Sequence, residues 1–216
     1  MSQNSIFIAG IGTDVGKTIV SSILCNALDW DYWKPIQTGP TIDHDRNFVS
    51  QCQNNHNFQI FEESYIFKNP LSPHIAAKKE GTIIDLKTIK IPSSNRNLIV
   101  EGAGGIMVPI DYAGNTNLDL IKKLDLEVIV VSRHYLGSIN HTLLTIEKLK
   151  SENIQILGLI YVGDEIIGTK EIIELNTGIK TIIDIPWFFN PIVDKIKDFC
   201  TKNKTLIQKN ILGGLQ

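Results

Sequence analysis

The sequence SIFIAGIGTDVGKT occupies residues 5–18 and joins an apolar run to a glycine-rich turn that ends in Gly-Lys-Thr. The run Ser5–Ala9 predicts a buried strand, and the spacing of apolar residues over Lys17–Leu28 predicts a helix directly after the turn. Glycines let backbone N–H groups crowd around phosphate oxygens at the positive end of such a helix. A strand, this turn and a helix, in that order, therefore predict a phosphate-binding loop (P-loop).

The loop is one residue longer than the usual form, in which four residues separate the two outer glycines. Here five residues lie between Gly10 and Gly16, and Ile11 stands where the usual form has its first glycine. We expect Gly12 to absorb the additional residue in a wider loop. Lys17 would place a positive charge at the outer phosphates, and the Thr18 hydroxyl would bind Mg²⁺. The residues of the loop that we expect to contact a nucleotide are Gly12, Thr13, Asp14, Val15, Gly16, Lys17, Thr18 and Ile19.

The composition describes an ordinary globular chain of moderate size. It has 216 residues, of which 43% are hydrophobic and 20% charged, with a formal net charge of −2. Such a length builds one substantial core, and the absence of a basic block argues against nucleic acid or a membrane surface as a partner. No apolar run is long enough to span a membrane, and the N-terminus does not resemble a signal peptide. Because three scattered cysteines also suit a reducing compartment, we expect a cytoplasmic protein.

Further apolar runs alternate with amphipathic segments along the rest of the chain. We expect strands that end near Lys34 and at Glu101, and strands over Glu127–Ser132, Ile154–Val162 and Thr181–Trp187. The expected helices include Asn117–Leu124, Ser138–Lys150 and Pro191–Lys202, while residues 37–92 are less regular and form an insertion or an edge. Apolar strands separated by helices predict a mostly parallel sheet covered by helices on both faces. The sequence thus indicates one α/β domain of the P-loop NTPase type over residues 1–216.

Four polar or glycine-rich stretches lie at or directly after the ends of predicted strands. They are GIGTDVGKT (10–18), KPIQTG (34–39), EGAGG (101–105) and SRHYLGSIN (132–140). Ligands of open parallel sheets bind at the carboxyl ends of the strands. We therefore expect these four stretches to meet in one site.

Several of these motifs, in the same order, resemble the dethiobiotin synthetase family. The resemblance rests on the longer loop, KPIQTG with an acidic residue soon after it, SPH (72–74), VEGAGG (100–105), LGSINH (136–141) and IPW (185–187). It covers nearly the whole chain and makes the longer loop the family's own form. It implies that ATP and Mg²⁺ drive closure of a ureido ring, converting 7,8-diaminopelargonic acid and CO₂ into dethiobiotin, ADP and phosphate. In the family an N-carbamate forms, is phosphorylated to a carbamic-phosphoric anhydride, and then loses phosphate to the second amine.

Two lysines are the leading candidates for catalysis. A carbamate and a triphosphate repel each other, so ammonium groups at their meeting point make physical sense. Lys34 matches the active-site lysine of the family, and we take Lys34, Lys17 and Thr13 as candidate catalytic residues. Thr38 matches a family serine that hydrogen-bonds the diamine or carbamate, although it could instead cap the turn.

Hard oxygen ligands for Mg²⁺ are available beside the loop. Thr18 and Glu101 are two expected ligands, and the third is Asp43 or Asp45, with the spacing from KPIQTG favouring Asp45. The resemblance extends the expected nucleotide contacts to Glu101, Gly102, Ala103, Gly104, Pro186, Trp187 and Phe188.

The LGSIN stretch opens a predicted helix whose first N–H groups suit a carboxylate, such as the one that ends the substrate's tail. The alternative is a capped helix that touches no ligand. In the family this segment comes from the neighbouring subunit, so the resemblance implies a homodimer with the substrate site at its interface. The expected substrate-binding residues are Lys34, Thr38, Leu136, Gly137, Ser138 and Asn140.

One position departs from the family. The strand matching Ile154–Val162 commonly ends in an asparagine that reads the adenine edge, whereas the matching residue here is Val162. Valine neither donates nor accepts a hydrogen bond, and stacking by Pro186 and Trp187 tolerates any purine. We therefore predict that GTP or CTP works within roughly tenfold of ATP, unless Asp164 or the C-terminal tail replaces the lost contact.

A nucleotide switch of the partition type is the alternative function. Such ATPases resemble this sheet order, but they carry an additional lysine early in the loop, where residues 10–14 of this chain contain none. A switch also has no evident use for a second lysine such as Lys34. An amidotransferase-type synthetase would need a further glutaminase domain, for which the chain has no room.

Overall fold

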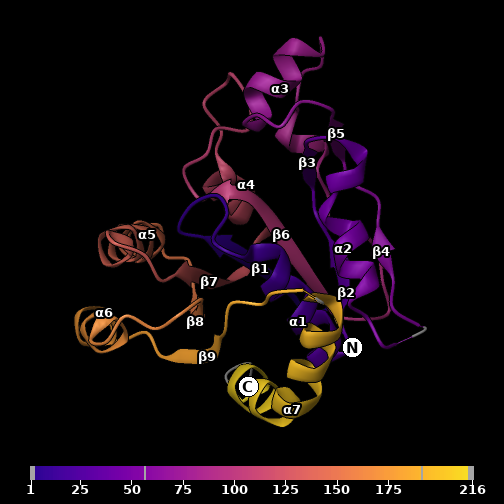
Figure 1. Cartoon of the computed structure of the whole chain (residues 1–216). Coiled ribbons are helices and arrows are strands. Elements are labelled where there is room, and N and C mark those ends of the chain that lie inside the picture. The colour runs from indigo at the N-terminus through magenta and orange to yellow at the C-terminus, as the bar shows by residue number, and fades with distance from the viewer. Residues whose placement is uncertain (1–2, 56, 191, 214–216) are drawn as a thin grey trace.

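Strand β1 (Ser5–Gly10) forms the centre of the structure, a computed structural model that describes residues 3–55, 57–190 and 192–213. It pairs in parallel with β6 (Leu98–Gly105) on one side and with β7 (Glu127–Arg133) on the other. The strands further out are β2 (Asp31–Trp33) and β4 (Ile60–Phe61) beyond β6, and β8 (Ile156–Val162) and β9 (Thr181–Ile185) beyond β7. Within the described residues, every pairing of this seven-stranded sheet is parallel (Figure 1).

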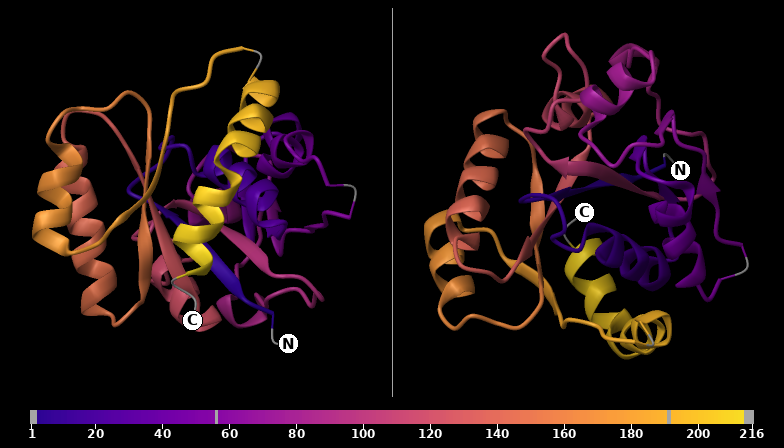
Figure 2. Two further views of the ribbon diagram at one scale, coloured as in Figure 1. Left: turned by 90° about the horizontal axis from the view of Figure 1, so that it is seen from below. Right: turned by 45° about the horizontal axis from the view of Figure 1, so that its top comes forward.

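Alternate residues of β1 are buried on opposite faces of the sheet. Ile6 and Ile8 belong to one hydrophobic cluster and Phe7 and Ala9 to another. The first cluster includes residues of α1 (Lys17–Leu28) and α7 (Ile192–Leu212), together with Val49 of α2 (Asp45–Gln51). The second includes residues of α3 (Pro73–Lys79), α4 (Asn117–Leu124), α5 (Ser138–Ser151) and α6 (Thr169–Thr177). Figure 2 shows α5 and α6 on one side of the sheet and α7 on the other, which confirms the expected α/β layers.

The expected elements of the central sheet are confirmed, with changes at their ends. Strand β9 ends at Ile185, before Pro186, which has no N–H to donate to a neighbouring strand. Helix α7 continues to Leu212 instead of ending at Lys202. Its later apolar residues Ile207 and Ile211 are buried, so packing extends the helix beyond the expected end. Pro191, the expected first residue of this helix, lies outside the described residues.

The segment from residue 37 to 92 combines short elements that the sequence pattern did not resolve. Strand β4 extends the main sheet at its edge, while β3 (Ile36–Thr38) and β5 (Tyr65–Phe67) pair as a separate parallel ribbon. Two short 3₁₀ helices, Thr41–Asp43 and Leu86–Thr88, lie in the same region. Strands of two or three residues are too short to show a periodicity, so this segment was correctly expected as an edge but not in its details.

The path of the chain brings one set of strand ends together. From β1 the chain moves to β2, returns to β6 beside β1, and then crosses to β7 on the other side of β1. The order of the strands therefore reverses direction at β1, and the crevice at such a point is where ligands of open α/β sheets bind. No helix in the described ranges has both the length and the apolar character needed to cross a membrane.

Candidate active site

The P-loop leaves β1 through a close approach that only glycine allows. A Cβ atom on Gly10 would lie 2.8 Å from the Gly12 carbonyl oxygen and 2.8 Å from Val15 Cγ2. The chain then turns through left-handed conformations at Asp14 (φ 56°) and Gly16 (φ 95°). Gly12 is not among the residues with positive φ, so the left-handed turns of the loop lie at Asp14 and Gly16. That Gly12 absorbs the additional residue stays a prediction.

Helix α1 begins at Lys17, directly after Gly16. No acidic residue lies in its first turn, so its N-terminal N–H groups and helix dipole favour an anion. The Lys17 ammonium group donates to the Gly12 carbonyl oxygen at 3.0 Å. Burial lowers the pKa of Lys17 to about 8, although the Glu101 carboxylate acts in the opposite direction. The arrangement is a preformed anion site with a lysine folded into its loop.

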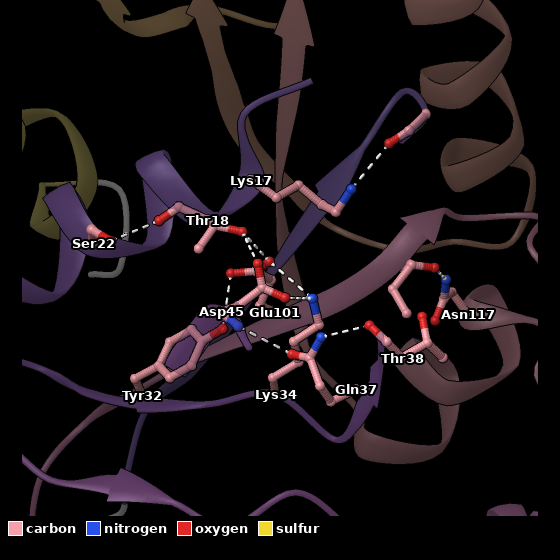
Figure 3. Close-up of polar contacts among 12 residues, drawn as sticks. Lys17, Thr18, Ser22, Tyr32, Lys34, Gln37, Thr38, Asp45, Glu101 and Asn117 are labelled. Atoms are coloured by element: carbon pink, nitrogen blue, oxygen red, sulfur yellow. Dashed lines mark hydrogen bonds and ion pairs between the residues drawn. The ribbon is translucent and has the colours of Figure 1, made fainter. Parts of the chain in front are cut away.

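A buried ionic cluster lies beside the loop (Figure 3). The Lys34 ammonium group, just after β2, forms ion pairs with Asp45 and, at 3.4 Å, with Glu101 Oε1. Burial acts to lower the pKa of Lys34, but the Glu101 and Asp45 carboxylates outweigh it and raise the pKa above its ordinary value. Burial likewise acts to raise the pKa of Asp45, and Lys34 outweighs it and lowers the pKa. Lys34 and Asp45 are therefore both charged near neutral pH.

Three oxygen-bearing side chains converge in this cluster. The Thr18 hydroxyl is hydrogen-bonded to Asp45 and lies 2.9 Å from Glu101 Oε1. A hydroxyl has one proton and can donate to only one of these carboxylates at a time. The Thr18 hydroxyl and the carboxylates of Asp45 and Glu101 thus place three oxygen ligands close together. Hard oxygen donors of this kind fit Mg²⁺, which keeps positions for waters and phosphate oxygens. The side chain of Asp43, the alternative ligand, lies outside the described part of the structure.

Neighbouring side chains hold the cluster in place. The Tyr32 hydroxyl donates to Glu101 Oε2 at 3.0 Å, which leaves Oε1 to face Thr18 and Lys34. The Gln37 side-chain oxygen accepts from the Asp45 N–H at 3.3 Å, at the start of α2. Neither Tyr32 nor Gln37 was identified as functional from the sequence, although Gln37 lies within the KPIQTG motif that was.

A cavity of about 780 Å³ opens above the loop and the cluster. The residues expected from the sequence that line it are Thr13, Asp14, Gly16, Lys17, Thr18, Ile19, Lys34, Thr38, Asp45, Glu101, Ala103, Gly104 and Trp187. Lining residues that were not expected to bind a ligand are Gln37, Pro70, Leu71, Ser72, Pro73, Val108 and Arg133. Residues of three of the stretches at strand ends (10–18, 34–39 and 101–105) therefore line one cavity. Arg133, from the fourth stretch (132–140), lines it as well.

Ser72 and Pro73, of the SPH motif, start helix α3. Ser72 is the N-cap residue and Pro73 is the first helical residue. The Ser72 side chain makes no capping hydrogen bond, however, and lines the cavity instead. Among the described residues, no side-chain hydrogen bond engages its hydroxyl.

Several expected nucleotide-binding residues do not line this cavity. Val15 and Gly102 are buried, and a Cβ atom on Gly102 would lie 2.7 Å from the Phe7 ring. The Phe188 ring packs edge-on against Phe199 of α7, with 5.7 Å between the ring centroids. Gly12 and Pro186 are likewise absent from the lining.

The LGSIN stretch, expected to bind substrate, lies outside the cavity of its own chain. Ser138 is 1% exposed, and its N–H donates to the Tyr135 carbonyl oxygen at 3.0 Å. Leu136, by contrast, is 100% exposed, and Gly137 and Asn140 are exposed as well. Within one chain this segment forms a projecting surface at the start of α5.

Val162 points away from the cavity. Its side chain is fully buried, and a Cβ atom on Gly16 would lie 3.1 Å from Val162 Cγ1. The next residue, Gly163, is the one whose Cβ position faces Trp187, at 4.0 Å from its ring. Neither position at the end of β8 offers a polar side chain to a base.

The geometry of this site agrees with the proteins to which the sequence is similar. Residues 4–190 match the family model described as AAA domain. The chain is 45% identical to an ATP-dependent dethiobiotin synthetase BioD of Christiangramia forsetii, over 92% of this chain and 95% of that protein. It is 45% identical to the one of Cytophaga hutchinsonii, over 83% and 86% of the two chains. For the one of Paramagnetospirillum magneticum the identity is 42%, over 85% and 88%.

Solved structures of other proteins share the fold alone. A ParA family ATPase from Chlorobium tepidum superimposes with a TM-score of 0.58 at 15% identity, covering 100% of this chain and 98% of the other. The MinC:MinD cell division complex of Aquifex aeolicus gives 0.55 at 13% identity, covering 97% and 96%. Identity this low shows a common sheet and loop but says nothing of the reaction. The sequence relatives decide the family: the chain belongs to the ATP-dependent dethiobiotin synthetases.

Proposed function

We propose that this protein is an ATP-dependent ligase of biotin biosynthesis that forms dethiobiotin from 7,8-diaminopelargonic acid and CO₂. One observation carries the proposal: the P-loop and the ion pairs of Lys34 with Asp45 and Glu101 line the same cavity. A loop that only bound and released a nucleotide would not need a second, buried lysine beside its phosphate site. The family relationship supports the same reading.

Lys34 and Lys17 would offset the charge repulsion between the two reacting groups. A carbamate must approach a triphosphate, and two like unit charges 4 Å apart repel by about 4 kcal/mol at an effective dielectric constant of 20. Both ammonium groups line the cavity, and the carboxylates of Asp45 and Glu101 keep Lys34 charged. A preformed positive charge where negative charge meets is the usual form of electrostatic catalysis.

Thr18, Asp45 and Glu101 are the residues that would hold Mg²⁺. When bound, the ion would neutralise charge on the phosphates during phosphoryl transfer. Tyr32 fixes one Glu101 oxygen by a hydrogen bond of 3.0 Å, so that the other stays directed at Thr18. The protein thus orients its ligands before the nucleotide arrives.

Hydroxyl groups offer hydrogen bonds to the diamine or its carbamate. Thr38 ends strand β3, and both Thr38 and Ser72 line the cavity near Lys34 in the folded chain. Gln37 donates through its amide to the Thr38 carbonyl oxygen at 2.8 Å, which ties the turn that carries Thr38. The two hydroxyls would orient the nitrogen atoms that take part in ring closure.

The tail of the substrate is proposed to reach a second copy of this chain. The substrate ends in a carboxylate, and the N-terminal turn of a helix suits a carboxylate. The segment 136–140 at the start of α5 is largely exposed and lies away from its own cavity. A homodimer in which each chain presents this segment to its neighbour would complete both sites.

Mixed dimers test this arrangement. A variant with Lys34→Ala and a variant damaged at Ser138 to Asn140 should each lack activity, and their mixture should regain part of it, because one intact site can form. Subunit exchange is verified with differently tagged chains. If exchange is complete and no activity returns, each chain completes its own site.

One assay tests the reaction. The protein is incubated with diaminopelargonate, bicarbonate and Mg-ATP, and dethiobiotin is sought by mass spectrometry. Dethiobiotin formed in proportion to ADP supports the proposal. ADP without dethiobiotin would instead support the partition-type switch.

The buried, unpaired thiols of Cys25, Cys52 and Cys200 suit the cytoplasm that we propose as the site of the enzyme.

A further inference from the structure

Arg133 is a lining residue of the cavity that the reaction, as proposed so far, does not use. It is the last residue of β7, which lies on the other side of β1 from the strand that leads to Lys34. Its Nη1 atom donates to the Asp14 carbonyl oxygen of the P-loop at 3.2 Å. No ion pair joins Arg133 to a carboxylate among the residues that the structure describes. Within this part of the chain, the charge of Arg133 is therefore not neutralised by a carboxylate.

The guanidinium group of Arg133 lies over the indole ring of Trp187. Its central carbon is 4.4 Å from the ring centroid. Arginine stacks on aromatic faces because its planar, delocalised cation is weakly hydrated. Trp187 packs in turn against the hydrophobic cluster between the sheet and helices α1 and α7, so the stack rests on the core. The Trp187 ring, packed against the core, and the Arg133 guanidinium group, tied to the P-loop, together form one wall of the cavity.

The surroundings of this wall suit a flat ligand. Of the described residues that line the cavity, Trp187 is the only aromatic one and Arg133 the only arginine. Val162 is buried beneath Gly16, and Gly163 has no side chain, so the adjacent strand end contributes no polar contact. The loop and the start of α1 would hold the phosphates of a nucleotide. A base placed against this wall would meet the Arg133 guanidinium group and the Trp187 ring, and no polar side chain of Val162 or Gly163.

We propose that Arg133, supported by Trp187, is the stacking platform for the base of the bound nucleotide, which lies against the guanidinium plane. The proposal rests on the proposed use of ATP but not on the ring-closing reaction. Bases stack on arginine planes as they do on aromatic rings, and every base has a face that can stack. The platform thus contributes to affinity without selecting one base.

Binding measurements without diaminopelargonate or bicarbonate test this role. The dissociation constants of Mg-ADP, Mg-GDP and tripolyphosphate are measured by calorimetry for the full chain and for Arg133→Ala and Arg133→Lys. Lysine is the matched control, because it keeps the positive charge and loses the plane. We expect both variants to bind ADP and GDP about tenfold more weakly, by similar factors for the two bases, and to bind tripolyphosphate as the unchanged protein does.

Other outcomes would overturn the proposal. An equal loss for tripolyphosphate would make Arg133 a phosphate-binding charge, and full ADP affinity in Arg133→Lys would show that the charge and not the plane matters. No change in either variant would remove Arg133 from the nucleotide site. Thermal melts without ligand check that the variants fold. If Arg133→Ala does not fold, the binding constants of Arg133→Lys alone decide the role of Arg133. The dethiobiotin assay is separate, so a failure of the proposed reaction is distinguished from a failure of the platform.

Discussion

The cavity has two walls of opposite character. At one, Lys34, Asp45 and Glu101 form a buried ionic cluster in which Glu101 is 1% exposed. At the other wall, the Arg133 guanidinium group lies over the Trp187 ring beside the P-loop. A buried charge that loses its partner costs several kcal/mol, whereas a lost stacking contact costs about 1–3 kcal/mol. Substitutions at the ionic wall should therefore have large and specific effects, and the planar wall should tolerate change.

Replacing Lys34 should have the largest effect. Lys34→Ala removes the charge proposed to stabilise the meeting of carbamate and triphosphate, so the rate should fall by about 3–5 kcal/mol of barrier, or several powers of ten. Lys34 is 8% exposed and forms two ion pairs. The variant should therefore also melt at a lower temperature, with Mg²⁺ restoring part of the loss. Steady-state rates and melting curves with and without Mg²⁺ measure both effects.

The matched control for Lys34 is Lys202→Ala, an exposed lysine on α7. It should leave the rate and the melting temperature unchanged. Near-normal turnover in Lys34→Ala would remove Lys34 from the catalytic role and make the ionic wall a structural feature.

Loss of one of the carboxylates proposed to bind Mg²⁺ should have the next largest effect. Glu101→Gln keeps the size of the side chain and removes its charge, so the Mg²⁺ concentration needed for half-maximal rate should rise by about tenfold or more. Asp45→Asn should act in the same way, and Asp43→Asn should not. Rates measured across a Mg²⁺ titration separate the three variants. Sensitivity of Asp43 in place of Asp45 would contradict the assignment of the ligand.

Removal of the Tyr32 hydroxyl should have a moderate effect on stability. Burial, together with Glu101 beside it, raises the pKa of the Tyr32 hydroxyl well above its usual value, so the group remains a donor throughout the working pH range. Tyr32→Phe leaves the buried Glu101 Oε2 without this donor, which should cost about 1–3 kcal/mol of unfolding free energy. Denaturant unfolding measures the loss. Tyr112→Phe is the control, because Tyr112 is 65% exposed and its hydroxyl makes no hydrogen bond within the described residues, and an equal loss there would mean that the effect is not specific to Glu101.

The smallest effect is expected for the choice of base at the planar wall. Because neither Val162 nor Gly163 offers a polar contact, GTP and CTP should support the reaction within roughly tenfold of ATP. Values of kcat/KM for the three nucleotides under one set of conditions measure the ratio. A preference for ATP above about a hundredfold exceeds what stacking provides and would show that another residue, such as Asp164, reads the base.

Local patterns in the sequence were sufficient for the framework of the molecule. The apolar run at Ser5–Ala9 and the helical spacing of Lys17–Leu28 depend on neighbours in the chain, and both elements form where they were expected. The Gly-Lys-Thr junction predicted the P-loop because the turn, the helix start and the lysine are adjacent in sequence. Strand ends predicted a shared edge because parallel strands place their carboxyl ends together. The sequence also predicted that Glu101 and Asp45 lie together, and both form ion pairs with Lys34.

Only the tertiary structure decided which side chains face each other. The Tyr32 hydroxyl and Glu101 meet across 69 positions of sequence, and no local pattern encodes that contact. Arg133 ends β7 and Trp187 follows the end of β9, with β8 between these two strands in the sheet, so their stacking depends on how the loops cross the sheet edge. The direction of Val162, inward and beneath Gly16, follows from the pleat and register of β8. Periodicity reports which residues are buried, whereas partners and directions arise only when distant segments pack together.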